Sequence, residues 1–484
     1  MPEPPNLLFI FTDEQRWDTL PCYGNDAVLA PHLEGLASQG AIFEHAYVTQ
    51  SICTPSRSSL LTGYYPHTTG CIGNNVALPA DMPTIAELVP ADYQRGYVGK
   101  WHLGNEVIAQ HGFEEWVSLD DEYRAHYSQP EYTETLSDYH HFLVANGFEP
   151  DTEEHGARVF SRPFAAQREE RFTKARFVGS RTADMVRRYA GQDEPFLIYA
   201  NLLEPHMPFT GPLNDLHSPE DIGTGPAFFE KPPENAALVN RMLAEFFLNS
   251  EWEGHDLRTE AGWRRIRANY LGLVTLVDNA VGEILQALED SGVADNTIVV
   301  FTSDHGDMMG DHGILAKATQ YEEAVRVPLL VRAPWLEGQG QRVAGRFSQI
   351  DLVPTLLDLL GQPVPCELHG QSRVGALQGD GSLEEEDVFI EWNGRHGRPG
   401  PPFTTADEAT KRMLALPWRT VIAADGWKLN LNAEDQCELY HLDTDPYEQH
   451  NRFDDPDQRH RIRELTQRIE AWQERTADSA RLPA

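Results

Sequence analysis

Residues 6–13 read NLLFIFTD, a continuous apolar run that ends in an aspartate. An uninterrupted run of this length is typical of a parallel strand that is buried on both faces. Helical segments alternate with such runs, most clearly at 31–40, 263–292 and 351–361. Strands that alternate with helices predict an α/β fold in which helices sandwich a large, mostly parallel sheet. The other strand-like runs are RGYVGKWH (95–102), EPFLIYANLL (194–203), NTIVVFTSD (296–304) and VPLLVRAP (327–334).

The length of 484 residues and a change in pattern along the chain predict two domains. Residues 1–365 carry the alternating strands and helices, interrupted at about 114–175 by an insertion with little periodicity. Residues 366–484 begin irregularly and then show a hairpin-like stretch at 418–432. A charged amphipathic helix at about 456–476 follows. We expect this second part to be a small α+β domain.

The charge of the chain narrows the class of partner. The 39 basic and 75 acidic residues give a formal net charge of −36. This balance argues against nucleic acid as a partner, because surfaces that bind nucleic acid are basic. We interpret the charge as a solubility feature or as an adaptation to a salty cytoplasm. An anionic substrate would then need a strong local positive site.

The N-terminal run and the cysteines are those expected of a cytoplasmic protein. No apolar run reaches the ~18 residues of a membrane span, and no basic segment precedes the short apolar run at the N-terminus. The cysteines are scattered, odd in number and in no metal-type spacing. They stand at positions 22, 53, 71, 366 and 437. We therefore expect a reducing cytosol, no disulfide framework and no membrane partner.

A second stretch, SICTPSRSSLLTG (51–63), places a cysteine at the start of a predicted helix. Thr54 suits the N-cap, Pro55 the first helical position and Gly63 the end of the helix. Cys53 would then lie at the positive end of the helix dipole, with Arg57 one turn further along. Such a position stabilises a thiolate and favours a reactive cysteine. For a lone cysteine, a buried structural role is the alternative interpretation.

Two of the predicted strands end in an aspartate that is followed by another potential metal ligand. Asp13 is followed by Glu14, and Asp304 by His305. Sites in open α/β sheets form outside the carboxyl ends of strands, where two carboxylates would repel each other without a cation between them. Oxygen ligands suit Ca²⁺, whereas the nitrogen of His305 leaves Mn²⁺ open. Taken singly, either aspartate could simply start a turn.

Four basic residues stand at or just beyond the ends of predicted strands: Lys100, His102, His206 and Lys317. Lys100 and His102 are two apart, and we expect both to point to one face of the sheet. Together with Arg57 and a divalent cation, the two lysines would form a cationic well suited to a tetrahedral oxyanion. The two histidines could supply base and acid on its opposite sides. For each residue alone, a surface lysine or a satisfied core histidine is the alternative.

These motifs and several others resemble blocks of the type I, formylglycine-dependent sulfatase family, part of the alkaline phosphatase-like superfamily. CTPSRSSLLTG is similar to the family signature, in which Cys-x-Pro-Ser-Arg is followed by Leu-Thr-Gly. The resemblance spans nearly the whole chain apart from 114–175 and 366–415, and it outweighs the structural interpretation of Cys53. The other similar blocks, in the family's order, are TDEQRWDTL, APHLEGLASQGAIFEHAYV, GYVGKWHLG, EPHMPF, TSDHGDMMGDHG and ELYHLDTDPYEQHN.

The resemblance implies roles for the site residues. In such enzymes a maturation enzyme oxidises the cysteine to Cα-formylglycine (3-oxoalanine), whose hydrate attacks the sulfur of a sulfate ester and then collapses to release sulfate. By similarity, Arg57 and Lys100 hold the diol, and His102 takes the proton that triggers its collapse. His206 and Lys317 bind the sulfate and assist the leaving oxygen. The resemblance implies a metal site made of Asp13, Glu14, Cys53, Asp304 and His305.

We therefore expect a sulfuric ester hydrolase that acts on a small anionic ester. The sequence departs from the family pattern at two positions, which leaves a second activity open. Family members commonly carry aspartate where Glu14 stands, and many carry asparagine where His305 stands. An Asp-His pair also occurs in branches similar to choline sulfatase, iduronate sulfatase and phosphonate monoester hydrolase. The nearest rival is thus a phosphonate monoester or phosphodiester hydrolase on the same scaffold. A rival of another class is a catalytically silent binding protein in which Cys53 stays a thiol.

The insertion and a loop near residue 394 are the candidates for recognition of the alcohol part of the substrate. Loops carry binding residues more often than the elements they connect. The family often assembles, so the resemblance also implies that the chain could form a homo-oligomer. The candidate residues of the loop are Glu391, Trp392, Asn393, Arg395 and His396.

Overall fold

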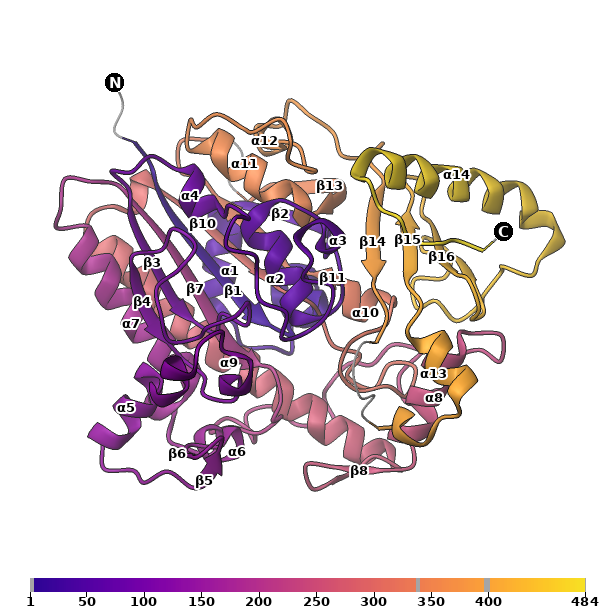
Figure 1. The fold of residues 1–484 in the computed structure, drawn as a ribbon, viewed down its shortest axis with the longest axis horizontal. Coiled ribbons are helices and arrows are strands. Elements are labelled where there is room, and N and C mark those ends of the chain that lie inside the picture. The colour runs from indigo at the N-terminus through magenta and orange to yellow at the C-terminus, as the bar shows by residue number, and fades with distance from the viewer. Residues whose placement is uncertain (1–3, 337–339, 396–400, 484) are drawn as a thin grey trace.

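A computed structural model of the protein describes residues 4–336, 340–395 and 401–483. Figure 1 shows a larger body built around one sheet, with a smaller sheet and helix α14 (Arg459–Thr476) beside it. The larger sheet is mostly parallel and is flanked by helices. The predicted α/β fold class is therefore confirmed.

Among the described residues the central sheet has nine strands, and β1 (Asn6–Asp13) lies in its interior. β1 is parallel to β10 (Thr297–Ser303) on one side and to β7 (Phe196–Pro205) on the other. Beyond β7, β3 (Gln94–Gly99) and the edge strand β4 (Glu115–Ser118) are also parallel. Beyond β10 the sheet is mixed, and β12 is antiparallel to both of its neighbours. The remaining strands are β2 (Ala41–Tyr47), β11 (Arg326–Val327), β12 (Leu329–Arg332) and β13 (Arg342–Ser348).

Alternate residues of the central strands pack against helices on opposite faces of the sheet. Leu8 and Ile10 of β1 belong to a core with α1, α7 and α9, whereas Leu7 and Phe9 belong to a core with α2, α4 and α11. Because both faces are covered, every position of β1, β7 and β10 is buried, which explains the uninterrupted apolar runs. The helices are α1 (Pro31–Gln39), α2 (Cys53–Thr62), α4 (Ile85–Leu88), α7 (Lys174–Tyr189), α9 (Glu260–Asp290) and α11 (Leu352–Leu359).

α9 is the longest helix of the described residues, and Thr259 caps it by accepting a hydrogen bond from the Gly262 N–H at 3.2 Å. By length and hydropathy alone it could cross a membrane. However, 78% of its most apolar 18-residue window is buried inside the protein. The helix therefore has the burial of a core helix.

The smaller sheet is antiparallel, and β15 and β16 form its predicted hairpin. α14 lies beside this sheet (Figure 1). It packs against the sheet through Leu465, Ile469 and Trp472. The domain boundary expected near residue 365 stays a prediction. The strands are β14 (Val388–Trp392), β15 (Trp418–Ile422), β16 (Trp427–Asn432) and β17 (Glu438–His441).

The insertion at 114–175 is more regular than its sequence pattern suggests. It begins with β4 at the edge of the central sheet and continues with α5 (Asp138–Ala145), β5 (Thr152–Glu154), β6 (Ala157–Val159) and α6 (Arg162–Ala166). Each element is too short to show a hydrophobic period. The other short elements are α3 (Pro66–Thr69), α8 (Leu238–Phe247), β8 (Glu251–Trp252), β9 (His255–Asp256), α10 (Glu322–Val325), α12 (Val374–Leu377) and α13 (Glu408–Leu414).

Candidate active site

The candidate active site lies where the carboxyl ends of β1 and β10 meet. Asp13 is the last residue of β1, and Asp304 directly follows β10. Since the two strands are parallel neighbours, both carboxylates reach the same edge of the sheet. The backbone N–H of Glu14 donates to Asp304 Oδ1 at 3.1 Å and ties the strand ends together. All three side chains are fully buried.

α2 brings Cys53 to the same place. The helix begins at Cys53, so the prediction that Thr54 is the N-cap is wrong. The Thr54 hydroxyl instead donates to the carbonyl oxygen of His102 at 2.7 Å, which takes it away from the helix end. Gly63 ends the helix with a φ of 74°, as predicted. Cys53 therefore lies at the positive end of the helix dipole.

Four buried side chains form a donor set that could hold a cation. One potential ligand atom from each of Asp13, Cys53, Asp304 and His305 lies within 4.8 Å of the others. Cys53 Sγ is 3.6 Å from Asp13 Oδ1 and 3.2 Å from His305 Nε2. His305 Nδ1 lies 2.9 Å from the Gly306 carbonyl oxygen, which leaves Nε2 for the cluster. Two carboxylates and an imidazole in this arrangement fit a divalent cation.

Arg57 contacts both aspartates from the helix side. Its guanidinium donates to Asp13 Oδ2 at 2.8 Å and to Asp304 Oδ2 at 2.9 Å. Its Nη1 also donates to the Lys100 carbonyl oxygen at 2.8 Å and to Asn201 Oδ1 at 2.9 Å. Burial would lower the pKa of Arg57, but the charges of Asp304 and Asp13 raise it above its ordinary value. Arg57 is thus a fixed cation next to Cys53.

Lys100 places a second cation against Asp13, with 2.6 Å between its Nζ and Asp13 Oδ2. Burial opposes ionisation of Asp13, but Lys100, His206 and Arg57 together hold the pKa of this carboxyl well below its usual range. Burial likewise opposes the charge on Lys100, whose pKa Asp13 and Cys53 nevertheless raise well above its ordinary value. At neutral pH the pair is therefore a carboxylate and an ammonium.

The strand predicted over 95–102 ends earlier than expected, so Lys100 and His102 lie beyond it. β3 ends at Gly99, and His102 adopts a φ of 57°. The buried carboxylate of Glu106 accepts hydrogen bonds from the N–H groups of Trp101 and His102, at 2.9 and 2.5 Å. This turn, and not strand alternation, directs the two basic side chains to the site.

The ring of His102 is held neutral in this turn. Its Nε2 lies 2.9 Å from Asn75 Oδ1, while its Nδ1 has no hydrogen-bond partner among the described residues. Burial, and then the charges of Lys100 and Arg57, lower the pKa of His102 well below its ordinary value. A neutral ring with one free nitrogen can accept a proton there.

A second group of side chains flanks the first. Glu14, which has a φ of 71°, places Oε2 2.6 Å from Lys317 Nζ and 3.3 Å from His206 Nε2. One ligand atom from each of Asp13, Glu14 and His206 also lies within 4.8 Å of the others. The other oxygen, Glu14 Oε1, is buried and has no hydrogen-bond partner in the described part of the chain. The structure thus brings Glu14 to the site, but beside Lys317 and outside the four-residue donor set.

The electrostatics of this second group follow from burial. Burial raises the pKa of Glu14 well above its ordinary value, a shift that Lys317 opposes and Asp307 reinforces. Burial and the charge of Lys317 lower the pKa of His206 well below its ordinary value. His206 Nδ1 lies 2.8 Å from the Met207 carbonyl oxygen and donates to it, so Nε2 is the atom that faces the site.

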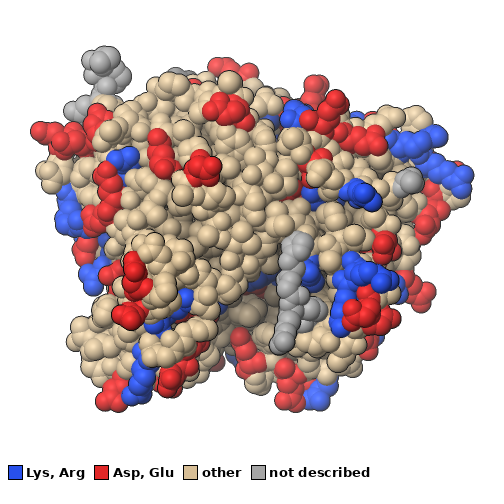
Figure 2. Space-filling view, in the orientation of Figure 1, with Lys and Arg blue, Asp and Glu red and all other residues tan. Residues whose placement is uncertain are grey.

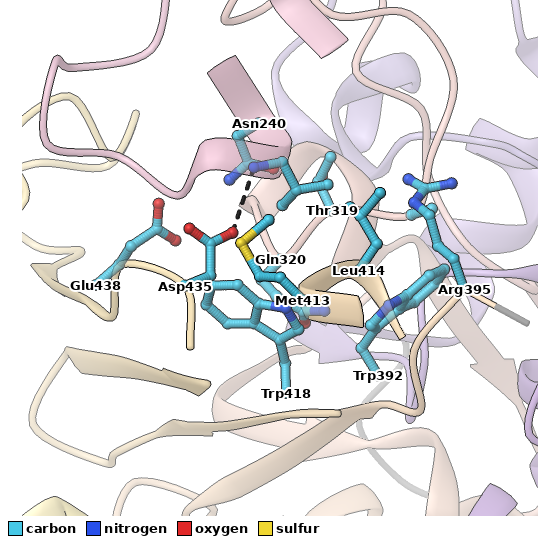
Figure 3. Close-up of a pocket in the computed structure, with 12 residues that line it drawn as sticks. Asn240, Thr319, Gln320, Trp392, Arg395, Met413, Leu414, Trp418, Asp435 and Glu438 are labelled. Atoms are coloured by element: carbon cyan, nitrogen blue, oxygen red, sulfur yellow. Dashed lines mark hydrogen bonds between the residues drawn. The ribbon is translucent and has the colours of Figure 1, made fainter. Parts of the chain in front are cut away.

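Two of the predicted substrate-binding residues, Trp392 and Arg395, line a narrow pocket beside the smaller sheet (Figure 3). Trp418 and Ala318 line it as well. The two tryptophans pack with Ile52, the residue before Cys53, so the pocket adjoins the site. The Arg395 guanidinium lies 5.5 Å from the Trp392 ring centroid, within cation–π range.

The segment from Glu391 to Trp392 is not a loop, which corrects the expectation for these residues. Both belong to β14, are buried and pair with β15. Asn393 donates to Gln50 Oε1 at 2.9 Å and accepts from Arg419 Nη2 at 3.0 Å, so its amide is already engaged. His396 lies outside the described residues.

Sequence patterns missed three residues at the site: Asn75, Tyr123 and Asn201. Asn201 Nδ2 donates to the Phe11 carbonyl oxygen at 2.9 Å, and its Oδ1 accepts from Arg57. A lone amide in an otherwise apolar strand was the available signal, because buried polar groups need partners. Asn75 and Tyr123 lie in irregular segments, where no periodicity marks them.

Comparisons with known proteins identify relatives of this site. The family model described as Sulfatase matches residues 5–362. The chain is 29% identical over 464 residues to the uncharacterized sulfatase YidJ of Escherichia coli (strain K12), which covers 93% of this chain and 83% of that protein. It is 26% identical over 536 residues to the N-acetylglucosamine-6-O-sulfatase of Bacteroides thetaiotaomicron, covering 98% of this chain and 87% of that protein.

One solved structure of similar fold is named as an enzyme other than a sulfatase. The phosphonate monoester hydrolase of Agrobacterium radiobacter matches with a TM-score of 0.76 and 25% sequence identity. The match covers 98% of this chain and 96% of that chain. The chain is thus similar both to sulfatases and to a phosphonate monoester hydrolase.

Proposed function

The chain belongs to the sulfatase family, and from that premise we propose that it hydrolyses sulfate monoesters to an alcohol and inorganic sulfate. The observation that carries the proposal is the position of Cys53. It is the first residue of α2, and its sulfur lies 3.6 Å from Asp13 Oδ1 and 3.2 Å from His305 Nε2. The fixed cations Arg57 and Lys100 adjoin it. This arrangement suits attack on the central atom of a tetrahedral anion.

The working form of Cys53 in this proposal is Cα-formylglycine, made by a formylglycine-generating maturation enzyme. Once hydrated, this group would supply an oxygen nucleophile for the sulfur of the ester. Cys53 is 1% exposed, and all ten residues of α2 are buried. A second enzyme could therefore reach the cysteine only before α2 packs against the sheet.

Arg57 and Lys100 would bind and orient the group at position 53, since both keep their charge in the buried site. His102 would accept a proton at Nδ1, the nitrogen that Asn75 leaves free. Its lowered pKa keeps the ring neutral and ready for this step.

His206 and Lys317 would bind the sulfate and assist the leaving oxygen. A bound ester adds negative charge next to His206, which opposes the effect of Lys317 and raises the pKa of His206 from its lowered value. His206 Nε2 could then hold a proton and deliver it to the leaving oxygen. Lys317 would balance the charge that develops there.

A divalent cation would be held by the donor set of Asp13, Asp304, His305 and the group at position 53, with Glu14 adjoining. When bound, the cation would polarise the sulfuryl group. Carboxylate oxygens favour Ca²⁺, and the imidazole of His305 makes Mn²⁺ the alternative.

A phosphonate monoester or phosphodiester hydrolase is the second candidate. Its support is the 25% identity and full-length likeness to a phosphonate monoester hydrolase structure. Sulfate monoesters, phosphonate monoesters and phosphodiesters are all tetrahedral esters with a single negative charge, so the same cations could bind each of them. A catalytically silent binding protein that keeps the Cys53 thiol is the candidate of another class.

Two measurements on one preparation separate these candidates. Peptide mass spectrometry should find CHO, or its hydrate, in place of CH₂–SH at Cys53, and elemental analysis should find Ca or Mn. A matched panel of aryl sulfates, phosphonate monoesters and phosphodiesters should then show the highest kcat/KM for sulfates. Turnover by protein whose Cys53 is entirely unmodified would contradict the mechanism, and preference for phosphorus esters would favour the second candidate. The expression host must supply the maturation enzyme.

We also propose a cytoplasmic location, a small anionic ester as substrate and a chain that could form a homo-oligomer, without a nucleic-acid or membrane partner. The net charge of −36 supports the absence of nucleic acid. Acidic and basic side chains are interspersed over the face seen in Figure 2, with no single basic patch. The five cysteines, all of them among the described residues, form no disulfide with one another, which supports a reducing compartment.

A further inference from the structure

We infer that Tyr123, carried by the insertion, is a positioning residue that holds His102 and Lys100 in their working arrangement. The inference rests on the proposed function, which makes these two residues part of the reaction. The ring of Tyr123 stacks on the His102 ring, with centroids 4.0 Å apart and planes 25° from parallel. The same ring lies 5.4 Å from Lys100 Nζ, within cation–π range.

His102 needs such a support because its other contacts leave one motion open. Glu106 holds its backbone through the N–H groups of Trp101 and His102. Asn75 contacts its ring at one nitrogen only, so the ring could still turn about its bonds to the backbone. A second ring stacked on its face blocks that turn, because rotation would drive the imidazole into the phenol. Tyr123 therefore fixes the direction in which His102 Nδ1 points.

Tyr123 is itself fixed by charged residues of the insertion. Arg162 Nη2 donates to the Tyr123 hydroxyl at 2.7 Å and to Asp120 Oδ2 at 2.8 Å. Arg162 Nε lies 2.9 Å from Glu122 Oε2, and Lys174 Nζ lies 3.5 Å from Asp120 Oδ2. Two cations and two carboxylates thus anchor the phenol. Through Tyr123 the insertion thus contacts both His102 and Lys100.

Lys100 gains from the same ring. Its ammonium is bound to Asp13 on one side and faces the negative π surface of Tyr123 on another. The phenol adds attraction without adding a negative charge, so it does not compete with an anionic substrate. A carboxylate in this place would neutralise the site, whereas an aliphatic residue would leave the imidazole and the ammonium unsupported.

The test compares Tyr123→Leu, which removes the ring, with Tyr123→Phe, which keeps the ring and loses only the bond to Arg162. Tyr132→Leu, in the same insertion, is the matched control. The first readout needs no matured enzyme. It is the NMR spectrum of protein with unmodified Cys53 and ¹⁵N-labelled histidine rings. The signals of His102 are assigned as those that disappear in the His102→Gln variant. We expect a proton on Nε2 in the wild type, in Tyr123→Phe and in Tyr132→Leu, and a mixture of tautomers in Tyr123→Leu.

The second readout is turnover by the matured variants. Tyr123→Leu should lower kcat about 10- to 100-fold, with KM changed less than about threefold, because misplaced groups affect the reaction more than binding. Tyr123→Phe should restore kcat to within about threefold of the wild type, since stacking is retained. Unchanged His102 signals in Tyr123→Leu, a kcat within twofold of the wild type, or a Tyr123→Phe variant as slow as Tyr123→Leu would each overturn the inference. A matured wild type without sulfatase activity would overturn the proposed function instead, while the His102 signals would still test Tyr123.

Discussion

Two buried clusters of this protein are built from the same kinds of side chain, namely histidine, carboxylates and arginine. One is the candidate active site at the ends of β1 and β10. The other, which we call the tail cluster, joins α3, the smaller sheet and the residues after α14, and potential ligand atoms of three of its side chains also lie within 4.8 Å of one another. The tail cluster consists of His67, Glu391, Arg419 and Asp478.

In the tail cluster every donor has an acceptor. Arg419 donates to the two carboxylate oxygens of Asp478 through Nε and Nη2, at 2.7 Å each. His67 Nδ1 lies 2.7 Å from Glu391 Oε2, and Nε2 lies 3.1 Å from the Thr476 carbonyl oxygen. Since both ring nitrogens face acceptors, His67 carries both protons. His67 and Arg419 then supply two positive charges that balance the two carboxylates.

At the candidate active site the pairing is incomplete. Arg57 and Lys100 balance the aspartates, but Glu14 Oε1 and His102 Nδ1 are buried without hydrogen-bond partners among the described residues. No buried polar atom of the four tail-cluster side chains lacks a partner. Of these two clusters, the one whose donors and acceptors match is therefore the candidate for a structural role, and the one with unpaired reactive atoms is the candidate for chemistry.

The largest expected effect is the loss of turnover when the nucleophile of the candidate active site is removed. Cys53→Ala should lower kcat by at least about 10³-fold, because it removes the nucleophile. The free energy of unfolding should change little, since Cys53 makes no bond that its neighbours need. Steady-state kinetics with an aryl sulfate and thermal denaturation measure the two effects. Cys22→Ala is the matched control, a buried cysteine away from the site. Residual turnover near the wild-type rate would contradict the assigned role.

Arg419→Met should break the tail cluster. It leaves Asp478 and Glu391 buried without their cation, so we expect a loss of about 3–5 kcal/mol in the free energy of unfolding. Turnover per folded molecule should stay within about threefold of the wild type, because Arg419 touches none of the reacting groups. Arg461→Met, which removes a partly exposed pair with Asp425, is the control and should cost less than about 1 kcal/mol. Denaturant titration distinguishes them, and equal losses would show that the tail cluster is not structural.

His206→Ala sharpens the assignment of an acid at the active site. We expect kcat/KM to fall about 10- to 100-fold for esters with poor leaving groups and much less for activated aryl esters. A series of substrates that differ in the pKa of the leaving alcohol measures this dependence. His217→Ala removes a buried histidine bound to Thr275, and it should leave the dependence on the leaving group unchanged. If His206→Ala lowered kcat/KM by the same factor for every ester, the result would argue against proton donation by His206.

The smallest expected effect is a dependence of stability on pH that comes from the tail cluster. Burial lowers the pKa of His67, but the hydrogen bond and charge of Glu391 outweigh it and raise the pKa above the ordinary value. A raised pKa in the folded state stabilises the protein fully below the unfolded pKa, and this contribution is lost as pH rises through the folded pKa. Unfolding free energies of wild type and His67→Gln should therefore converge above neutral pH. A difference that grows with pH would contradict a charged His67.

Much of the fold could be predicted from local pattern. Five apolar runs became five strands of the central sheet, because strands buried on both faces leave a continuous apolar signal. The insertion could not be predicted in this way, since its elements are short and partly exposed. β14 was missed for a related reason, as Glu391 and Trp392 look like loop residues until Arg419 and His67 give the carboxylate its partners.

The candidate site shows the same limit at the level of single side chains. Asp13 and Asp304 could be paired in advance, because parallel strands deliver their ends to one edge. The direction of His102 could not, since it depends on a positive φ that Glu106 supports from four residues away. The surroundings of Glu14 were open for the same reason, and the fold places its Oε2 beside Lys317 and His206.

Sequence alone determined which reactive groups are present: a cysteine at the start of a helix, carboxylates at the ends of two strands, and basic side chains after the other strands. These features are local, and helix caps, strand ends and apolar runs leave their mark within a few neighbouring positions. Only the tertiary structure decided which of these groups come into contact, which have all their hydrogen bonds made and which keep an unpaired atom. The partners of a buried group come from residues that are distant along the chain. Arg419 pairs with Glu391 in this way, and Tyr123 stacks on His102.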